Sequence, residues 1–336
     1  MSEDAYARAG VDQGAADSAV AALVAVLGRI ELGRPSRQVH LPGHYASVIR
    51  IDGQTGIALC TDGVGTKLLV AEQLGRFDTV GIDCVAMNVN DVICVGAEPL
   101  AMLDYIAIER ADPEICEQIG IGLARGAEAA GVEIPGGELA QLGDLVRGFD
   151  VAGACFGTVA LDAIVDGSAV EPGDPVIGLP SSGLHSNGYT LARSALAGIA
   201  LDEDPEGRLG RPLGEALLEP TEIYVRPVLE LLRSPVEVRG LAHITSGGLE
   251  NLLRLAAAVG YEIDDPLAPQ PIFELIGERG GVGDDEMHRV FNMGCGFCCV
   301  VAAADEPEAV GMLREHYPQA RRIGRATAAV GEISRA

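Results

Sequence analysis

The chain of 336 residues has no tryptophan and only one lysine, Lys67, among its 24 basic residues. Aromatic residues make up 4% of the chain, so alanine, valine, leucine and isoleucine must fill the core. The formal net charge of -25 would repel a polyanion and argues against a nucleic-acid partner. No apolar run is long enough to span a bilayer, and the acidic N-terminus lacks the basic and apolar regions of a signal peptide. We therefore expect a cytoplasmic protein with no membrane partner.

The eight cysteines are scattered, and most of them lie in apolar runs. This placement is typical of buried, reduced thiols in a cytoplasmic protein. Cys295 and Cys298 form a CxxC pair, but no second pair and no histidine set lies at zinc-like spacing. A core strand is therefore the better interpretation of this segment than a metal site.

The order of apolar runs, turns and caps predicts two halves that each mix helices and strands. Strands are expected at 47–51, 57–61, 99–109, 132–134, 151–161, 176–179 and 296–302. Helices are expected at 79–95, 187–199, 221–233, 247–258, and between the cap Asp112-Pro113 and Gly131. A further helix at 12–30, capped by Asp12, is expected to be amphipathic or largely buried. The polar stretch near 168–174 predicts a boundary between domains 1–168 and 169–336.

Lys67 ends the run TDGVGTK at residues 61–67, which predicts a phosphate site. Glycine lets backbone N–H groups approach an anion, and a helix N-terminus adds its dipole. Asp62 can hold the Mg²⁺ that bridges phosphates, and a compact ammonium suits such a site better than the arginine fork. The run lacks the Walker A spacing, and Leu68 stands where a dinucleotide fingerprint needs its third glycine. The alternative is that one lysine survived a biased genome by chance.

A polar cluster interrupts the apolar helix expected at 79–95. It contains Asp83, Asn88, Asn90 and Asp91, although Asn and Asp are poor helix formers. Metal coordination by Asp91, with Asp83 as a second candidate, or nucleotide binding would explain the cluster. The alternative is that these side chains bond backbone groups where the helix meets a loop.

Two further segments are typical of anion sites. The run SSGLHSNGY at 181–189 combines serine hydroxyls and glycine N–H groups ahead of a helix. His185 within it is a candidate for proton transfer or for donation to a phosphate. Gly247-Gly248 opens another expected helix. Ordinary helix capping is the alternative for both segments.

The motifs together resemble one family in order and spacing. TDGVGTK at 61–67, with the segment from Gly81 to Pro99, resembles aminoimidazole ribonucleotide synthetase, also called phosphoribosylformylglycinamidine cyclo-ligase, of purine biosynthesis. The similarity continues in YARAGVD at 6–12, GGE at 136–138, FDVAG at 149–153, SSGLHSNGY at 181–189, EPT at 219–221, IYV at 223–225, 243–251 and EMHRVFNMG at 286–294. It covers nearly the whole chain.

The resemblance implies an α+β fold with an N-terminal mixed sheet that forms a homodimer and a C-terminal α/β domain. It implies ATP-dependent closure of formylglycinamidine ribonucleotide to an imidazole, through phosphorylation of the formyl amide oxygen. Lys67, His185 and Asp62 are then the expected catalytic residues, with Lys67 clamping the transferred phosphoryl group. Mg²⁺ is assigned to Asp62, Asp91 and Glu138, with Asp83 and Asp104 as further candidates.

The same resemblance distributes the remaining site residues between two ligands. The residues expected to bind ATP or phosphate are Thr61, Gly63, Gly65, Thr66, Asn88, Asn90, Gly136 and Gly137. The residues expected to bind the ribonucleotide are Ser181, Ser182, Gly183, Ser186, Asn187, Gly188, Gly247 and Gly248.

The chain departs from the family at several positions. Leu139 and Gln141 replace a hydroxyl and a carboxylate after Glu138, and Ser246 replaces the first of three glycines. His40 and His44 lie in a segment that is more similar to archaeal-type members. We expect them to be loop residues rather than metal ligands, with closure over ATP as a further candidate role. Two alternatives follow: a paralogue with another acceptor, similar to thiamine-phosphate kinase or selenophosphate synthetase, or a nucleotide-binding regulator without turnover.

Overall fold

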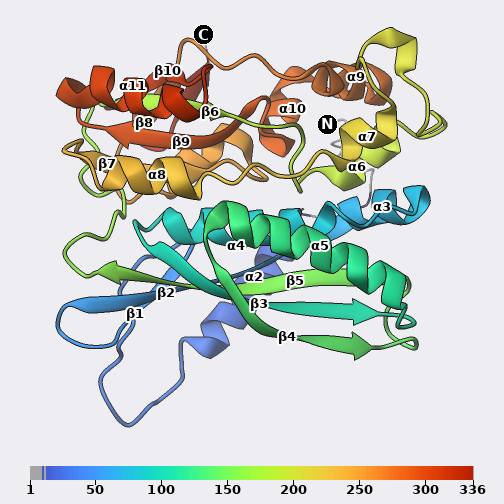
Figure 1. Cartoon of the computed structure of the whole chain (residues 1–336). Helices are drawn as coiled ribbons and strands as arrows, with labels where there is room; N and C mark the ends of the chain where they lie inside the picture. The colour runs from blue at the N-terminus through green and yellow to red at the C-terminus, as the bar shows by residue number, and fades with distance from the viewer. Residues whose placement is uncertain (1–9, 11–12, 336) are drawn as a thin grey trace.

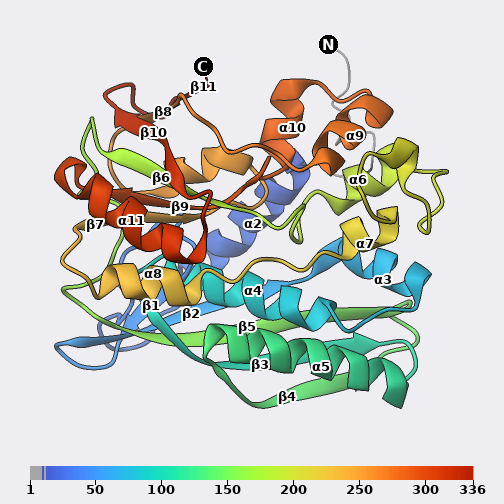
Figure 2. The ribbon, with the colours of Figure 1, turned by 45° about the horizontal axis from the view of Figure 1, so that its top comes forward.

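The computed structural model describes residue 10 and residues 13–335, which form two sheets with helices packed around them. Figure 1 shows helices α4 and α5 on the face of the first sheet that is turned toward the second half of the chain. Figure 2 shows α8 between α4 and α11, both of which it contacts. Helix α4 therefore lies at the junction of the two halves. The expected α+β fold, with a mixed N-terminal sheet and a second half of helices and strands, is confirmed.

The first sheet has the strand order β1-β2-β5-β3-β4. All neighbours are antiparallel except β3 and β4, which are parallel because α5 crosses between them. The elements of this half are α2 (Gln13–Leu27), β1 (Ser47–Arg50), β2 (Thr55–Gly63), the 3-10 helix η1 (Gly65–Lys67), α3 (Leu68–Leu74), α4 (Val80–Ile93), β3 (Glu98–Ile108), α5 (Pro113–Ala130), β4 (Glu133–Gln141) and β5 (Phe149–Ala160).

The second sheet has the order β11-β8-β10-β6-β9-β7. Its elements are β6 (Pro175–Pro180), α6 (Tyr189–Ala195), η2 (Pro205–Gly207), α7 (Leu213–Leu218), α8 (Val225–Leu232), β7 (Val238–His243), η3 (Gly248–Arg254), β8 (Gly260–Ile263), α9 (Pro271–Gly280), α10 (Asp284–Val290), β9 (Cys295–Val301), η4 (Ala303–Asp305), α11 (Glu306–His316), β10 (Arg321–Thr327) and β11 (Ile333–Arg335). The expected boundary at residue 168 falls between β5 and β6 and stays a prediction.

Local signals set the ends of α5 as expected. The Asp112 carboxylate accepts hydrogen bonds from the backbone N–H groups of Glu114 and Ile115, and Gly131 ends the helix in the left-handed region. Helix α4 crosses α5 so closely that a Cβ on Gly81 would lie 2.2 Å from the Leu123 nitrogen. The absence of a side chain there brings α4 into its place over the sheet.

The two faces of the first sheet differ in what covers them. Along β5, odd-numbered residues from Phe149 to Val159 are buried against the helices, whereas the alternate residues face the other side. Leu103 and Tyr105 of β3 are 41% and 42% exposed, and both lie on that other side. The first sheet thus keeps one partly apolar face open within a single chain.

Helix α2 corrects one expectation. Its described side chains are all exposed, with Val20 and Leu23 each 60% exposed, so it is not a largely buried helix within the chain. The predicted cap Asp12 and most of the segment 6–12 lie outside the described residues. Most residues of this helix are apolar, so its sequence pattern does not show whether a partner in the same chain covers it.

The CxxC segment is a buried core strand, as expected. Cys295 and Cys298 lie in β9, and their sulfur atoms are 3.6 Å apart without a disulfide. Among the described residues, no helix combines the length and apolarity needed to cross a membrane.

Candidate functional site

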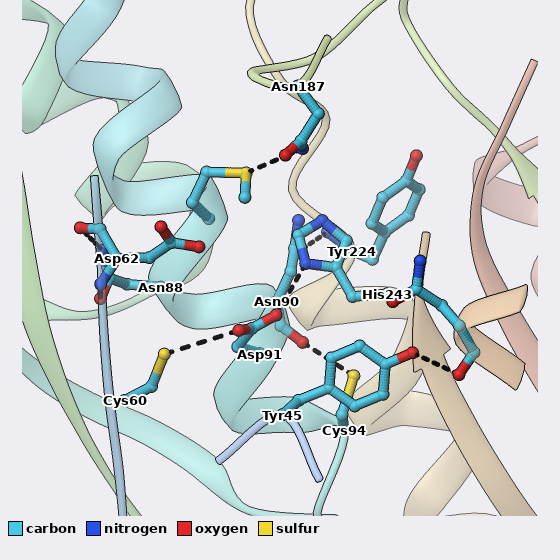
Figure 3. A network of polar contacts seen from close by, with 12 residues as sticks. Tyr45, Cys60, Asp62, Asn88, Asn90, Asp91, Cys94, Asn187, Tyr224 and His243 are labelled. Carbon is cyan, nitrogen blue, oxygen red and sulfur yellow. Dashed lines mark hydrogen bonds and ion pairs between the residues drawn. The ribbon is translucent and has the colours of Figure 1, made fainter. Parts of the chain in front are cut away.

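A polar network forms where the end of β2, the middle of α4 and the end of β7 meet (Figure 3). Asp62 comes from β2, Asn88 and Asp91 from α4, and His243 from β7. The loop before α6 adds Asn187 from the second half of the chain. Residues that are distant in the sequence are therefore neighbours, and two of the predicted carboxylates lie among them.

Asp62 is held by its backbone as well as by its carboxylate. Asn88 Oδ1 accepts from the Asp62 N–H at 3.0 Å, and Asn88 Nδ2 donates to the Asp62 carbonyl at 3.1 Å. The N–H of Gly63 donates to the carboxylate at 2.7 Å. Burial, followed by repulsion from Asp91, raises the pKa of Asp62 to about 6. Asp62 is thus a carboxyl group whose pKa lies close to neutrality.

Asp91 is held in place by the buried His243 and the half-buried Cys60. Its Oδ1 lies 2.9 Å from His243 Nδ1, and its Oδ2 lies 3.7 Å from the Cys60 sulfur. His243 is fully buried, and its Nε2 has no hydrogen-bond partner. The sequence interpretation did not include His243 in the site. A histidine at the end of a strand, four residues before Gly247-Gly248, was the available signal.

The structure does not bring Glu138 to these carboxylates. Strand pairing aligns Asp62, Gly153, Asp104 and Gly137 in one row across the sheet, whereas Glu138 belongs to the next row with Tyr105. Side chains of successive rows point to opposite faces, so Glu138 and Asp62 face different sides. Within residue 10 and residues 13–335, no group of three or more His, Cys, Asp or Glu is placed to hold a metal. The expected three-ligand set of Asp62, Asp91 and Glu138 is therefore not assembled within one chain.

Gly136 and Gly137 lie within an edge strand rather than a phosphate loop. A Cβ on Gly137 would lie 2.1 Å from Asp104 Oδ1, so this glycine makes room for the Asp104 carboxylate. Burial raises the pKa of Asp104. Gly136, by contrast, has no atom within 4 Å of such a Cβ.

Lys67 is fully buried, and its ammonium has three acceptors. Nζ lies 2.8 Å from Asp83 Oδ1, 3.1 Å from the His185 carbonyl and 2.6 Å from the Glu219 carbonyl. Burial lowers the pKa of Lys67, while the Asp83 carboxylate opposes that effect. An ammonium has three N–H donors, so none is left for a phosphoryl group in this arrangement. The clamp role stays a prediction, and the geometry favours a different role.

Asn90 also forms hydrogen bonds that connect the two halves of the chain. Its Nδ2 donates to the Glu222 carbonyl at 2.8 Å, and its Oδ1 accepts from the Tyr224 N–H at 3.0 Å. Both ends of the buried amide are therefore occupied by protein. The alternative interpretation, in which polar residues of this helix bond backbone groups, describes Asn90 better than nucleotide binding does.

The segment Thr61–Thr66 of the predicted phosphate site is open to solvent at several positions. Thr61, Gly65 and Thr66 are exposed, and Gly63 is half-buried. The Thr61 hydroxyl donates to the Gly153 carbonyl, and the hydroxyls of Thr66 and Thr190 are 3.2 Å apart. The second contact joins η1 to the start of α6, so the predicted ATP segment adjoins the helix that follows the predicted ribonucleotide loop.

The loop 181–188 is held by hydrogen bonds from its own serines and from Asn292. Ser181 Oγ donates to Asn292 Oδ1, and the Asn292 amide donates to the Gly183 carbonyl. Ser182 Oγ donates to the Pro220 carbonyl at 2.5 Å. Asn187 accepts from Ser246 Oγ at 3.1 Å, which connects the loop to the segment before Gly247-Gly248. The serines thus stabilise the loop, in which Ser182, Ser186 and Asn187 are half-buried, and the neighbouring Ser246 is exposed.

Several residues of this loop and of the turn at Gly247-Gly248 have a left-handed backbone conformation. Gly188 has a φ of 73° and precedes α6, Gly247 has a φ of 95° and precedes η3, and Gly248, the first residue of η3, has a φ of 55°. His185 is buried with a φ of 64°, and its Nε2 accepts from the Ser182 N–H at 3.2 Å. Burial, with His243 and Lys67 nearby, lowers the pKa of His185 well below its ordinary value. His185 is accordingly a neutral, buried group that shapes the loop.

The loop around His44 docks onto η3 through Arg254. The Arg254 guanidinium lies 3.9 Å from the Tyr45 ring centre and donates to the carbonyls of Gly43 and His44. The Tyr45 hydroxyl donates to the Asn251 carbonyl at 2.9 Å. Burial and the Arg254 charge lower the pKa of His44 to about 4. This part of the predicted ATP-closing loop is a packed contact between the two halves, whereas His40 is exposed.

Comparison with known proteins defines the class. Two family models match the chain: the N-terminal domain of AIR synthase related proteins at residues 43–159 and the C-terminal domain at residues 171–335. The chain belongs to this family of AIR synthase related proteins.

Two archaeal relatives within this family have high sequence identity to the chain. The chain is 51% identical over 294 residues to the phosphoribosylformylglycinamidine cyclo-ligase of Methanothermobacter thermautotrophicus, covering 87% of this chain and 85% of the relative. It is 48% identical over 329 residues to the cyclo-ligase of Thermococcus gammatolerans, covering 96% and 95%. The expected similarity to archaeal members is confirmed.

Solved structures share the fold at low identity. Hydrogenase maturation protein HypE in complex with ATP matches with a TM-score of 0.62 and 18% identity, over 85% of this chain and 83% of that chain. Thiamine monophosphate kinase from Aquifex aeolicus matches with a TM-score of 0.57 and 20% identity, over 84% and 88%.

Proposed function

We propose that the protein closes formylglycinamidine ribonucleotide to 5-aminoimidazole ribonucleotide with ATP, the cyclo-ligase step of de novo purine biosynthesis. The cyclo-ligases that it matches are 44–51% identical to it over most of their length. The observation that carries the proposal is the carboxylate pair Asp62 and Asp91 at the junction of the two domains, beside the loop 181–188.

The reaction transfers the γ-phosphoryl group of ATP to the formyl amide oxygen, which releases ADP. An amidine nitrogen then attacks the same carbon, the carbon–oxygen bond breaks, and phosphate leaves. The attacking nitrogen must lose a proton. The departing phosphate is itself a base near neutral pH and accepts that proton, whereas Asp62, whose pKa of about 6 a bound cation would lower, serves as a metal ligand.

The residues present fit a Mg²⁺ ion that arrives with ATP. Mg²⁺ commonly binds through one or two carboxylates together with phosphates and waters, so the missing third ligand is no obstacle. Burial and repulsion from Asp91 raise the pKa of Asp62, which is the effect of negative charge that lacks a compensating cation. Asp62 and Asp91 would hold the ion, which would offset the charge of the phosphates. His243 and Cys60 keep Asp91 in place.

Ring closure also needs the ribonucleotide held rigidly. We assign its phosphate to the loop 181–188 and the adjoining turn at Gly247-Gly248, and we assign the ATP phosphates to the segment 61–66. The contact between Asn187 and Ser246 joins the two ribonucleotide segments. Placement of this kind supplies much of the rate enhancement in reactions where the substrate carries the reactive groups.

The direct test is ADP release by purified protein with ATP, Mg²⁺ and formylglycinamidine ribonucleotide. We expect one ADP and one imidazole product per turnover, and no ADP when the ribonucleotide is omitted. The matched variant is Asp62→Asn, which keeps the side-chain shape and should lose turnover while it stays folded. Absence of ADP from the wild-type reaction would refute the proposal; ADP release with another acceptor would identify a paralogue, and ATP binding without turnover a regulator.

A homodimer through the open face of the first sheet belongs to the same proposal. Leu103, Tyr105 and Ile49 on this face are 41%, 42% and 37% exposed, which is costly for apolar side chains in water. A second copy would cover them. Light scattering should give twice the 34.8 kDa of the chain, and Leu103→Glu should shift the mass to that of one chain. A wild-type mass of 34.8 kDa would refute the dimer.

A further inference from the structure

The single lysine joins the two domains at one point. Its Nζ contacts the Asp83 carboxylate of α4 in its own domain, and the carbonyls of His185 and Glu219 in the other. Lys67 and Asp83 are both completely buried. The three acceptors come from segments that are distant in sequence, so the ammonium is a junction between them.

Asp83 extends the junction into the second domain. Its Oδ1 also accepts from the backbone N–H and the hydroxyl of Thr221, each at 2.7 Å. The other carboxylate oxygen, Oδ2, has no hydrogen-bond partner. The carboxylate and ammonium therefore fix the segment 219–221 together, from two sides.

That segment in turn fixes the loop 181–188. Ser182 Oγ donates to the Pro220 carbonyl, and the hydroxyls of Ser186 and Thr221 are 3.0 Å apart. Within the loop, His185 has a left-handed φ of 64°, which is unfavourable for a residue other than glycine. Lys67 holds the carbonyl of that residue. A strained peptide persists only where its surroundings hold it, and Lys67 is one of the groups that hold it.

The same geometry explains why lysine stands at this position in a chain that otherwise uses arginine. Three acceptors converge on one nitrogen atom, which the rotating donors of an ammonium satisfy. The flat guanidinium fork spreads its donors over three nitrogens and needs more space than a fully buried site provides.

We propose that Lys67 is a positioning residue, which sets the conformation of the loop 181–188 by anchoring the His185 and Glu219 carbonyls to Asp83. The consequence for substrate rests on the proposed function, in which this loop holds the ribonucleotide phosphate. Lys67 then determines the KM for the ribonucleotide without contacting it.

The test compares Lys67→Met with the double variant Lys67→Met/Asp83→Asn. The single variant leaves a buried carboxylate without its cation and should lose stability. The double variant removes both charges, and the introduced asparagine amide oxygen can still accept from Thr221, so its melting temperature should recover toward that of the wild type. The two released carbonyls should nevertheless raise the KM for the ribonucleotide by about tenfold. The KM for ATP should change by less than about twofold, because the two released carbonyls belong to the ribonucleotide loop and to the segment 219–221 that supports it.

Hydrogen exchange supplies a readout that does not depend on activity. Amides of residues 182–188 should exchange about tenfold faster in the double variant than in the wild type, because the loop opens more often. The control is Arg239→Met/Asp174→Asn, which removes a 3.0 Å ion pair within the C-terminal domain. This control should lose stability without altering exchange in the loop or either KM.

The outcomes separate the two proposals. If the double variant shows wild-type exchange in the loop, the positioning role is refuted, whatever its activity. An unchanged ribonucleotide KM beside normal turnover would refute it as well. If wild-type protein makes no imidazole but exchange still rises in the double variant, the proposed function fails and the positioning role stands.

Discussion

Asp62→Asn should make the protein more stable at neutral pH while it removes activity. The pKa of Asp62 rises from 3.8 to about 6 on folding, so the folded state holds the proton more tightly than the unfolded state does. At pH 8 the group is ionised in both states, and burying that charge costs about 3 kcal/mol. Below pH 3.8 the group is protonated in both states and the cost vanishes. Asparagine has no charge to bury and keeps an acceptor for the Gly63 N–H.

The size of the effect should therefore depend on pH in a defined direction. Between pH 8 and pH 5, the advantage of Asp62→Asn should shrink by about 1.4 kcal/mol, because wild-type Asp62 becomes protonated in the folded state. Urea unfolding at these two pH values measures it, above the pI of 4.5. The control is Asp52→Asn. Backbone N–H groups of Gln54 and Thr55 lower the pKa of this exposed carboxyl, so any loss in this variant should be constant from pH 8 to pH 5. A lower stability of Asp62→Asn at pH 8, or an advantage that is equal at both pH values, would refute the reasoning.

Three further predictions concern packing and contacts between the domains. Gly137→Ala should cost about 1–3 kcal/mol because its Cβ would lie 2.1 Å from Asp104 Oδ1, whereas Gly136→Ala, with open space, should change the melting temperature little; equal melting temperatures would contradict this. Asn90→Leu should cost about 3 kcal/mol in urea unfolding because it leaves two buried backbone groups of the C-terminal domain unpaired, and a loss below about 1 kcal/mol would show that they find other partners. Arg254→Met should speed hydrogen exchange at residues 41–46 because it removes the stacking and two hydrogen bonds that hold this loop, and unchanged exchange would argue against that anchor.

Features that depend on neighbours in the sequence were predictable. The cap at Asp112 and the stop at Gly131 define α5 because both act within one turn of the helix. The buried strand around Cys298 was equally predictable from its apolar run. Burial of α2 could not be judged in this way, because an apolar helix gives no information on whether its partner lies in the same chain.

Features that depend on distant partners were not predictable from the sequence alone. The resemblance predicted that Gly136 and Gly137 bind ATP or phosphate, yet both lie in β4, where Asp104 of the neighbouring strand occupies the space that a side chain at position 137 would need. Lys67 and Asn90 have the right chemistry for phosphate and nucleotide, but their partners in the second domain lie between 118 and 152 residues away. His243 was not predicted as a site residue because its partner, Asp91, is 152 residues away in the sequence.

Helix α4 carries residues that contact the C-terminal domain and residues of the carboxylate site. Asp83 and Asn90 are two turns apart on one face and hold the C-terminal domain, whereas Asn88 and Asp91 hold the end of β2 and meet His243. A rigid helix transmits any shift of one set to the other. The loop 181–188 therefore cannot move on α4 without changing its distance to the carboxylate pair. Substitutions at positions 83 and 90 should for this reason alter the KM for the ribonucleotide together with stability, although neither side chain reaches the open part of the site.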